Sequence, residues 1–129
     1  MMIRNLEVIK PGRIRKIRGS FSWIEHEFVN RGIIDMLTKE ELLLYYFLVS
    51  VGDKRGVSFY GRDKICGKIK IGIEQYEKAK QSLVEYDLIA YKPFNSNAQN
   101  GYFQVLSLPE RKVNINEFIK ERIIPNISA

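Results

Sequence analysis

The chain has 129 residues, 45% of them hydrophobic, and carries a formal net charge of +6. This size and apolar content predict one domain with its own hydrophobic core. The longest uninterrupted apolar run, residues 42–49, is far shorter than the roughly 20 residues that a membrane-spanning helix needs, and the N-terminus has no apolar signal-peptide core. We therefore expect a cytoplasmic protein that does not interact with membranes.

The same residue counts argue against catalysis. One cysteine and one histidine cannot form an internal disulfide or a zinc site with the usual four Cys and His ligands. The chain also has no glycine-rich phosphate loop and no Gly-x-Ser-x-Gly motif. We therefore predict that the protein is not an enzyme and has no metal or cofactor, and we assign Cys66 a structural position in the core.

In chain order, the first feature is a basic segment. Residues 1–18 contain six basic residues and one acidic residue, so most of the net positive charge lies there. Such a segment suits a polyanion such as nucleic acid, and the alternative is a solvated terminus without a specific partner. We define residues 1–20 as the N-terminal arm. Its expected phosphate contacts are Arg13, Arg15, Lys16 and Arg18.

Three aromatic residues follow the arm: Phe21, Trp23 and Phe28, with Ile24 and Val29 among them. Aromatic and aliphatic residues grouped in this way usually anchor a segment to the core, although aromatic rings can also stack on bases. We expect them to attach the arm to the folded domain.

The strongest helix signal follows Leu37. Thr38 and Glu41 have the spacing of a capping box, in which each side chain accepts a hydrogen bond from the other residue's backbone N–H. Gly52 is typical of a helix end. Apolar residues cover most of the helix circumference between these signals, so we expect this helix to be buried on most sides.

Two shorter helical segments and a β-hairpin come next. The inward positions are Ile65, Cys66 and Ile69 in the first helix and Ile73, Tyr76, Ala79 and Leu83 in the second. Their three- and four-residue spacing and their short connection predict a helix-turn-helix. Residues 88–92 and 102–108 are rich in strand-forming residues and enclose a loop that ends in Asn100-Gly101, which predicts the hairpin.

This order of elements resembles the winged-helix family of DNA-binding domains over residues 38–108. The matching residues are Ile65 and Cys66 in the first short helix, Ile71 in the turn, and Leu83, Leu88 and Ile89 at the end of the reading helix. The chain departs from the family pattern at three positions. These are Lys70, where the turn often has Gly; Gly72, where Ser or Thr would cap the helix; and Asp87, where many relatives have a left-handed Gly.

The resemblance implies a mainly α fold with a β-hairpin wing (α+β), that is, a winged helix-turn-helix with an N-terminal basic arm and a C-terminal helix. The arm would occupy residues 1–20, the winged-helix domain 21–110, and an amphipathic helix and tail 111–129. The C-terminal helix is also predicted by the capping-box spacing of Asn114 and Glu117, which precedes apolar residues at helical spacing.

Residues 19–61 are similar, in element order and in the pattern L-T-x-E-E-x-L, to small bacterial and phage-type replication-initiation and mobile-element proteins. These include the N-terminal domains of DnaD-like primosome proteins. The similarity implies DNA binding in replication initiation or in transcriptional regulation of a bacterial or mobile-element gene. The implied partners are DNA and either a second copy of the chain or a replication protein. The alternative is a protein-protein interaction or oligomerisation module on the same scaffold without direct base readout.

For base readout we assign Gln75, Lys78 and Gln81, which point away from the apolar face of the reading helix. An amide can bond adenine at two positions, and an ammonium can reach guanine. The alternative is a solvated helix face. Glu74 and Glu77 favour a protein partner, because carboxylates repel phosphates.

For phosphate contacts on the preceding helix and its turn we assign Lys64, Lys68 and Lys70. Such contacts would position the domain on DNA without reading its sequence. The alternative for these lysines is an ordinary contribution to solubility.

Overall fold

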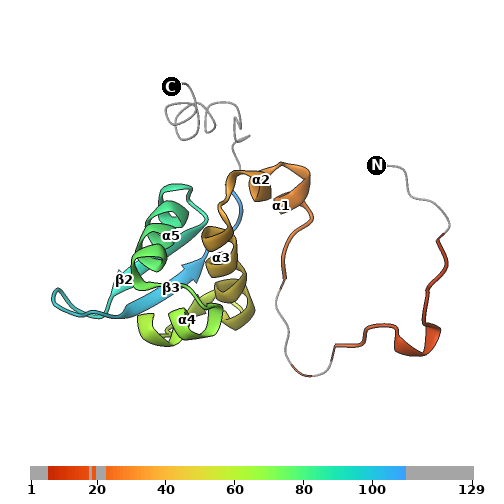
Figure 1. Ribbon diagram of the computed structural model, residues 1–129, viewed down its shortest axis with the longest axis horizontal. Helices are drawn as coiled ribbons and strands as arrows, with labels where there is room; N and C mark the ends of the chain where they lie inside the picture. The colour runs from red at the N-terminus through yellow and green to blue at the C-terminus, as the bar shows by residue number, and fades with distance from the viewer. Residues whose placement is uncertain (1–5, 18, 20–22, 110–129) are drawn as a thin grey trace.

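The computed structural model describes residues 6–17, 19 and 23–109 (Figure 1). Arg18, Phe21 and the helix predicted within 111–129 lie outside the described residues. The elements in chain order are η1 (Pro11–Arg13), α1 (Glu27–Asn30), α2 (Ile33–Met36), α3 (Lys39–Val51), β1 (Val57–Ser58), α4 (Arg62–Ile69), α5 (Ile73–Glu85), β2 (Ile89–Pro93) and β3 (Gly101–Val105). The described chain is therefore α+β, as the sequence predicts. In this part of the chain, no helix has both the length and the apolar character needed to cross a membrane.

The capping box predicted at the start of α3 is present. Thr38 Oγ1 accepts a hydrogen bond from the Glu41 backbone N–H at 3.2 Å, and Glu41 Oε1 accepts one from the Thr38 N–H at 3.0 Å. The helix ends before Gly52, as expected. Burial on most sides is also confirmed, since among its large apolar side chains only Leu43 and Tyr46 are exposed.

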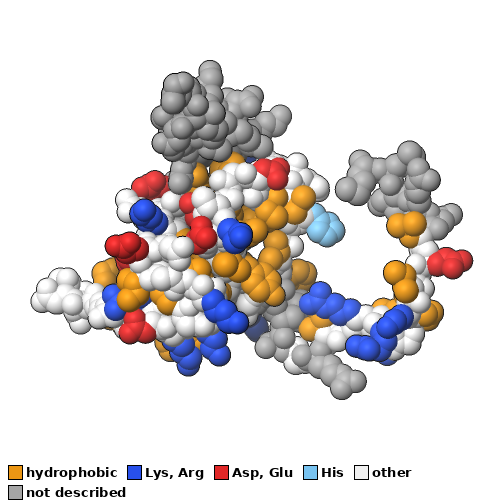
Figure 2. All heavy atoms as spheres, in the orientation of Figure 1, with side chains coloured by type: hydrophobic (Ala, Val, Ile, Leu, Met, Phe, Trp, Pro, Cys, Tyr) orange, Lys and Arg blue, Asp and Glu red, His pale blue; other side chains and the backbone are white. Residues whose placement is uncertain are grey.

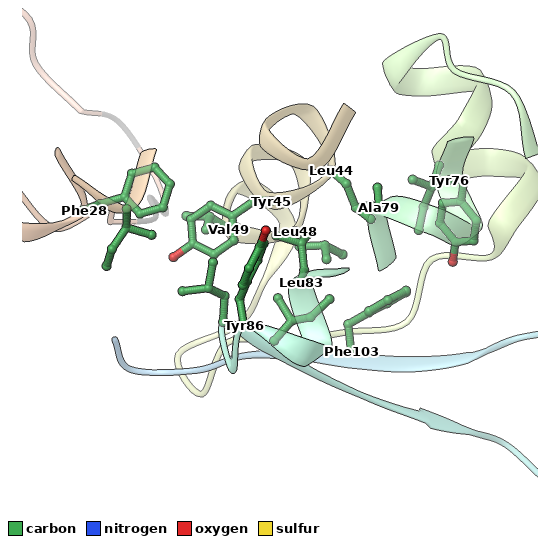
Figure 3. Packing of buried hydrophobic residues seen from close by; sticks show 14 residues of the cluster. Phe28, Leu44, Tyr45, Leu48, Val49, Tyr76, Ala79, Leu83, Tyr86 and Phe103 are labelled. Carbon is green, nitrogen blue, oxygen red and sulfur yellow. The ribbon is translucent and has the colours of Figure 1, made fainter. Parts of the chain in front are cut away.

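The hydrophobic core lies where α3 meets α5 and the sheet (Figure 3). Leu44 and Leu48 of α3 are fully buried, and the Tyr45 ring stacks on Phe28 with 4.9 Å between ring centroids. From α5, the predicted inward residues Tyr76, Ala79 and Leu83 are buried. Packing of α5 against α3 therefore fixes which of its faces is left for solvent.

Two predicted core positions at the edges of the helices differ from the expectation. Ile73 is 47% exposed, because it is the first residue of α5 and lies outside the contact with α3. Cys66 is only half-buried, although it packs against the core as predicted.

The turns that end α4 and α5 both contain a residue other than glycine in the left-handed conformation. Lys70 has φ 59° and Asp87 has φ 62°. In each turn the N–H of the following residue donates to a carbonyl five residues back, from Ile71 to Cys66 at 3.2 Å and from Leu88 to Leu83 at 3.1 Å. This is the Schellman arrangement, which usually has Gly at the left-handed position. Lys70 and Asp87 therefore form the same turn that Gly usually forms, although the left-handed conformation is less favourable for them than for Gly.

The predicted hairpin is confirmed, with a shorter second strand. Strands β2 and β3 pair antiparallel, with Tyr91 opposite Phe103. The strand was expected to reach Leu108 but ends at Val105. Beyond it, a single hydrogen bond from the Leu106 N–H to the Leu88 carbonyl continues the contact at 3.0 Å.

A third strand, β1, was not predicted from the sequence. It pairs with the other edge of β3, which gives the antiparallel order β1-β3-β2. Gly56, with φ 81°, precedes it, and a Cβ there would lie 2.5 Å from the Val105 carbonyl oxygen. The strand therefore requires a glycine at this position.

The two faces of the sheet have different environments. Ser58 and Phe103 point toward the core and are 4% and 1% exposed. The neighbouring positions alternate to the other face, where Ala90, Lys92 and Gln104 are exposed. One face of the sheet is therefore open among the described residues.

Replacing Lys70 with Gly should increase the free energy of unfolding by about 0.5–1 kcal/mol, because Gly adopts a left-handed conformation without steric cost. The matched control is Lys68→Gly within α4, which should lower the free energy of unfolding by a similar amount. Urea denaturation of both variants measures the difference. A Lys70→Gly variant as destabilised as Lys68→Gly would contradict the conformational assignment.

Burial, reinforced by the negative charge of Glu25, raises the pKa of Tyr45 to about 12, from an ordinary value of 10.0. The unfolded chain therefore loses this proton first, and stability should fall as the pH rises above 10. Between pH 9 and 11, the free energy of unfolding of the wild type should fall by about 1 kcal/mol more than that of Tyr45→Phe. Urea denaturation over this range tests it, and parallel curves would be inconsistent with the assignment.

Candidate nucleic-acid interface

The three residues predicted to read bases lie together on the exposed side of α5. Gln75, Lys78 and Gln81 are all exposed, one helical turn apart. They border a shallow hollow of about 320 Å³ between α5 and the start of α3, where Glu40 and Glu41 line the other side. The structure therefore brings these three side chains to one surface, and it places carboxylates beside them.

Gln75 has a structural role that the sequence analysis missed. Its Oε1 accepts a hydrogen bond from the Gly72 backbone N–H at 2.9 Å. This is half of a capping box, and Gly72 has no side chain to supply the other half. The Gln75 amide N–H groups stay available to a ligand, while the oxygen would have to share its second lone pair.

The other two residues have different surroundings. Gln81 Nε2 donates to Glu85 Oε1 at 3.1 Å, one helical turn further along. Within the described ranges no carboxylate forms an ion pair with Lys78. Of the three predicted reading residues, Lys78 therefore has the side chain with the fewest competing interactions among the described residues.

The lysines predicted to contact phosphate lie on α4 and in the turn after it. Lys64, Lys68 and Lys70 are exposed, and Figure 2 shows basic side chains gathered over the α4 end of the molecule. The Lys64 ammonium lies 5.3 Å from the centroid of the Tyr60 ring. This cation–π contact limits where the Lys64 side chain points.

Lys80 is excluded from this surface. Its ammonium lies 4.2 Å from the Tyr91 ring centroid and 3.4 Å from Glu77 Oε2. The side chain is only 18% exposed, so it connects α5 to the sheet.

The arm extends away from the helices (Figure 1). Arg13, Arg15 and Lys16 are exposed, and η1 forms a single turn there. The arm also carries exposed apolar side chains, which are Leu6, Val8, Ile9, Ile14 and Ile17.

The predicted aromatic anchor of the arm is only partly correct. Phe28 is 3% exposed and stacks on Tyr45, so it does attach the preceding segment to the core. Trp23 is 77% exposed and does not have the buried position expected of an anchor.

The loop between β2 and β3 is hydrogen-bonded to the start of α4. Asn100 Oδ1 accepts a hydrogen bond from the Arg62 backbone N–H at 3.0 Å. This bond satisfies one of the unpaired donors at the first turn of α4. Sequence reasoning missed it, because no local pattern relates residues 38 positions apart.

The remaining features of the described residues are the Cys66 thiol and a second cavity. Burial raises the pKa of the Cys66 thiol, with a further contribution from Asp63, which disfavours the reactive thiolate. Among the described residues, no group of His, Cys, Asp and Glu side chains could hold a metal ion. A larger cavity of about 840 Å³, lined by residues such as Trp23, Tyr45 and Leu108, contains none of the predicted site residues.

No protein-family model, curated protein or solved structure matches the chain. Its function is therefore inferred from the residues on its surface.

Replacing Gln75 with Ala should lower the free energy of unfolding by about 0.5–1 kcal/mol, because the Gly72 N–H loses its partner. Gln75→Glu keeps an acceptor and adds a favourable charge at the helix N-terminus, so its stability should match that of the wild type. Urea denaturation measures both. The control is Gln81→Ala, which loses only a surface side-chain bond and should change stability by less than about 0.5 kcal/mol. Equal losses for Gln75→Ala and Gln81→Ala would contradict the capping role.

Proposed function

We propose that the chain is a winged-helix protein that binds duplex DNA, with α5 in the major groove and the β2–β3 loop near the backbone. Its biological role would be replication initiation or transcriptional regulation of a bacterial or mobile-element gene, in the cytoplasm and without enzymatic activity. The order of α3, α4, α5 and the hairpin agrees with this scaffold.

One observation carries the proposal. Helices α4 and α5 are in contact and are joined by a short turn that carries Lys70, so exposed lysines and the exposed face of α5 belong to neighbouring elements. In this arrangement Lys64, Lys68 and Lys70 contact phosphates, while Gln75, Lys78 and Gln81 reach base edges. The arm adds Arg13, Arg15, Lys16 and Arg18 along the backbone or in a minor groove.

A second candidate is a protein-protein interaction module that binds a second copy of the chain or a replication protein. The acidic character of α5 favours it. Glu74, Glu77 and Glu85 are all exposed on this helix, and they would repel a phosphate backbone. A basic partner surface would be complementary to them.

Binding to random duplex DNA should weaken steeply with salt. The variant Arg13→Gln/Arg15→Gln/Lys16→Gln keeps the length of the arm but removes three charges, so the slope of log K against log salt should fall by about 2.7, or 0.9 for each contact. Fluorescence anisotropy between 50 and 200 mM salt measures the slope. A deletion of residues 1–18 should flatten it further. No binding at low salt would exclude the proposal in favour of the protein-interaction module.

The same assay tests the reading residues. Lys78→Ala should reduce preference among DNA sequences, while Gln75→Glu, which preserves the helix cap, should weaken binding to all of them by charge repulsion. If both variants kept the affinity and preference of the wild type, α5 would not be the reading helix.

A further inference from the structure

The open face of the sheet carries aromatic rings that none of the described helices covers. Phe59, directly after β1, is 74% exposed, and Phe94, directly after β2, is 58% exposed. Tyr102 on β3 is half-exposed. The β2–β3 connection projects beyond the helices (Figure 1). A contiguous group of exposed aromatic residues rimmed by polar ones is typical of a binding surface.

The strand register places these rings on one face. Ser58 pairs with Phe103, and both point into the core, so the next residues, Phe59 and Tyr102, point to the opposite face. Lys92 pairs with Tyr102 and shares that face. The Phe94 and Tyr102 rings are tilted neighbours with centroids 6.1 Å apart. The result is a cross-strand row of three rings with one lysine beside them.

The charge along β2, β3 and the loop between them favours an anion. From Leu88 to Pro109, which includes β2, β3 and the loop between them, the sequence has one cation, Lys92, and no acidic residue. The start of α4 borders the row, because Asn100 bonds the Arg62 N–H. Arg62 at this helix start pairs with the exposed Asp63 at 3.1 Å, so this end of the row carries one charge of each sign.

We propose that this face binds single-stranded nucleic acid, with bases stacked on Phe59, Tyr102 and Phe94 and phosphates near Lys92 and the start of α4. Bases in a duplex are stacked on one another and cannot present their faces to the rings, whereas unpaired bases can. The inference rests on the proposed function in one respect, namely that the chain binds nucleic acid, at α5 in the proposed function and at the open face of the sheet here. A protein that opens or traps a melted site would use the two surfaces together.

The polar residues of the face favour nucleic acid over a protein partner. Lys92 and Gln104 lie among the rings and are exposed. Lysine is depleted at the centres of protein interfaces, because its charge would lose water without compensation there. Beside a phosphate backbone the same charge is favourable.

The test measures binding of a fluorescein-labelled dT12 oligonucleotide and of a hairpin duplex to the full chain by anisotropy. Phe59→Leu and Phe94→Leu keep an apolar side chain but remove the ring, so each should weaken dT12 binding by about tenfold. Phe59→Tyr and Phe94→Tyr keep the ring and should bind within about twofold of the wild type. The matched control is Tyr46→Leu, which removes an exposed ring from α3 and should leave dT12 binding unchanged.

Salt dependence separates stacking from charge. The leucine variants should keep the wild-type slope of log K against log salt, whereas Lys92→Gln should lower it by about 0.7, the value for one contact to a single strand. We expect every variant to be folded, because both phenylalanines are exposed and contribute little to the core. Thermal melting checks this.

Two results would overturn the inference. One is the absence of dT12 binding at low salt, and the other is dT12 binding by both leucine variants that equals the wild type. Duplex binding that persists in either case would leave the proposed function intact. Absence of duplex binding by the wild-type chain, with dT12 binding retained, would instead contradict the proposed function alone.

Discussion

The contact between α3 and α5 is the constraint on which the rest of the structure depends. Because α3 buries Leu44 and Leu48 against α5, the residues Tyr76, Ala79 and Leu83 must point inward. The opposite side of α5 is then presented to solvent together with the neighbouring turn. The sheet packs on the same core through Phe103, and among the described residues its other face is open. The packing of this single core therefore determines both surfaces for which we propose a ligand, the exposed side of α5 and the open face of the sheet.

Elements with local signals could be predicted from the sequence. The Thr38 and Glu41 spacing identified the start of α3, and the left-handed turn at Asp87 agrees with a family pattern in which Gly is common. Features that depend on distant partners could not be predicted. Strand β1 is defined by its pairing with β3, which is distant in the sequence. Gln75 was assigned to base readout, but its side-chain oxygen accepts the hydrogen bond that caps α5. The row of aromatic residues on the sheet could not be predicted either. Strand β1 has two residues, which is too short for an alternating pattern of apolar and polar residues to be recognised.

The charges of the molecule are divided between its parts. Helix α5 has three glutamates and two lysines, whereas α4 has three basic residues and one aspartate. Residues 1–18 have six basic residues and one acidic residue. In the proposed function, a bound nucleic acid would therefore gain most of its electrostatic affinity outside α5. Contacts from α5 would contribute to selectivity more than to strength, because its carboxylates offset the attraction of Lys78.

Lys70, the left-handed residue that ends α4, affects both the stability of the fold and the proposed affinity for DNA. A glycine at position 70 would relax the backbone but would also delete a cation beside the proposed groove-facing surface. In the proposed function, stability and affinity for DNA are therefore opposed at this one residue, and selection for heat resistance alone would favour weaker binding. A library screened for thermal stability should be enriched in Gly at position 70, and a screen for DNA binding should remove the same substitution.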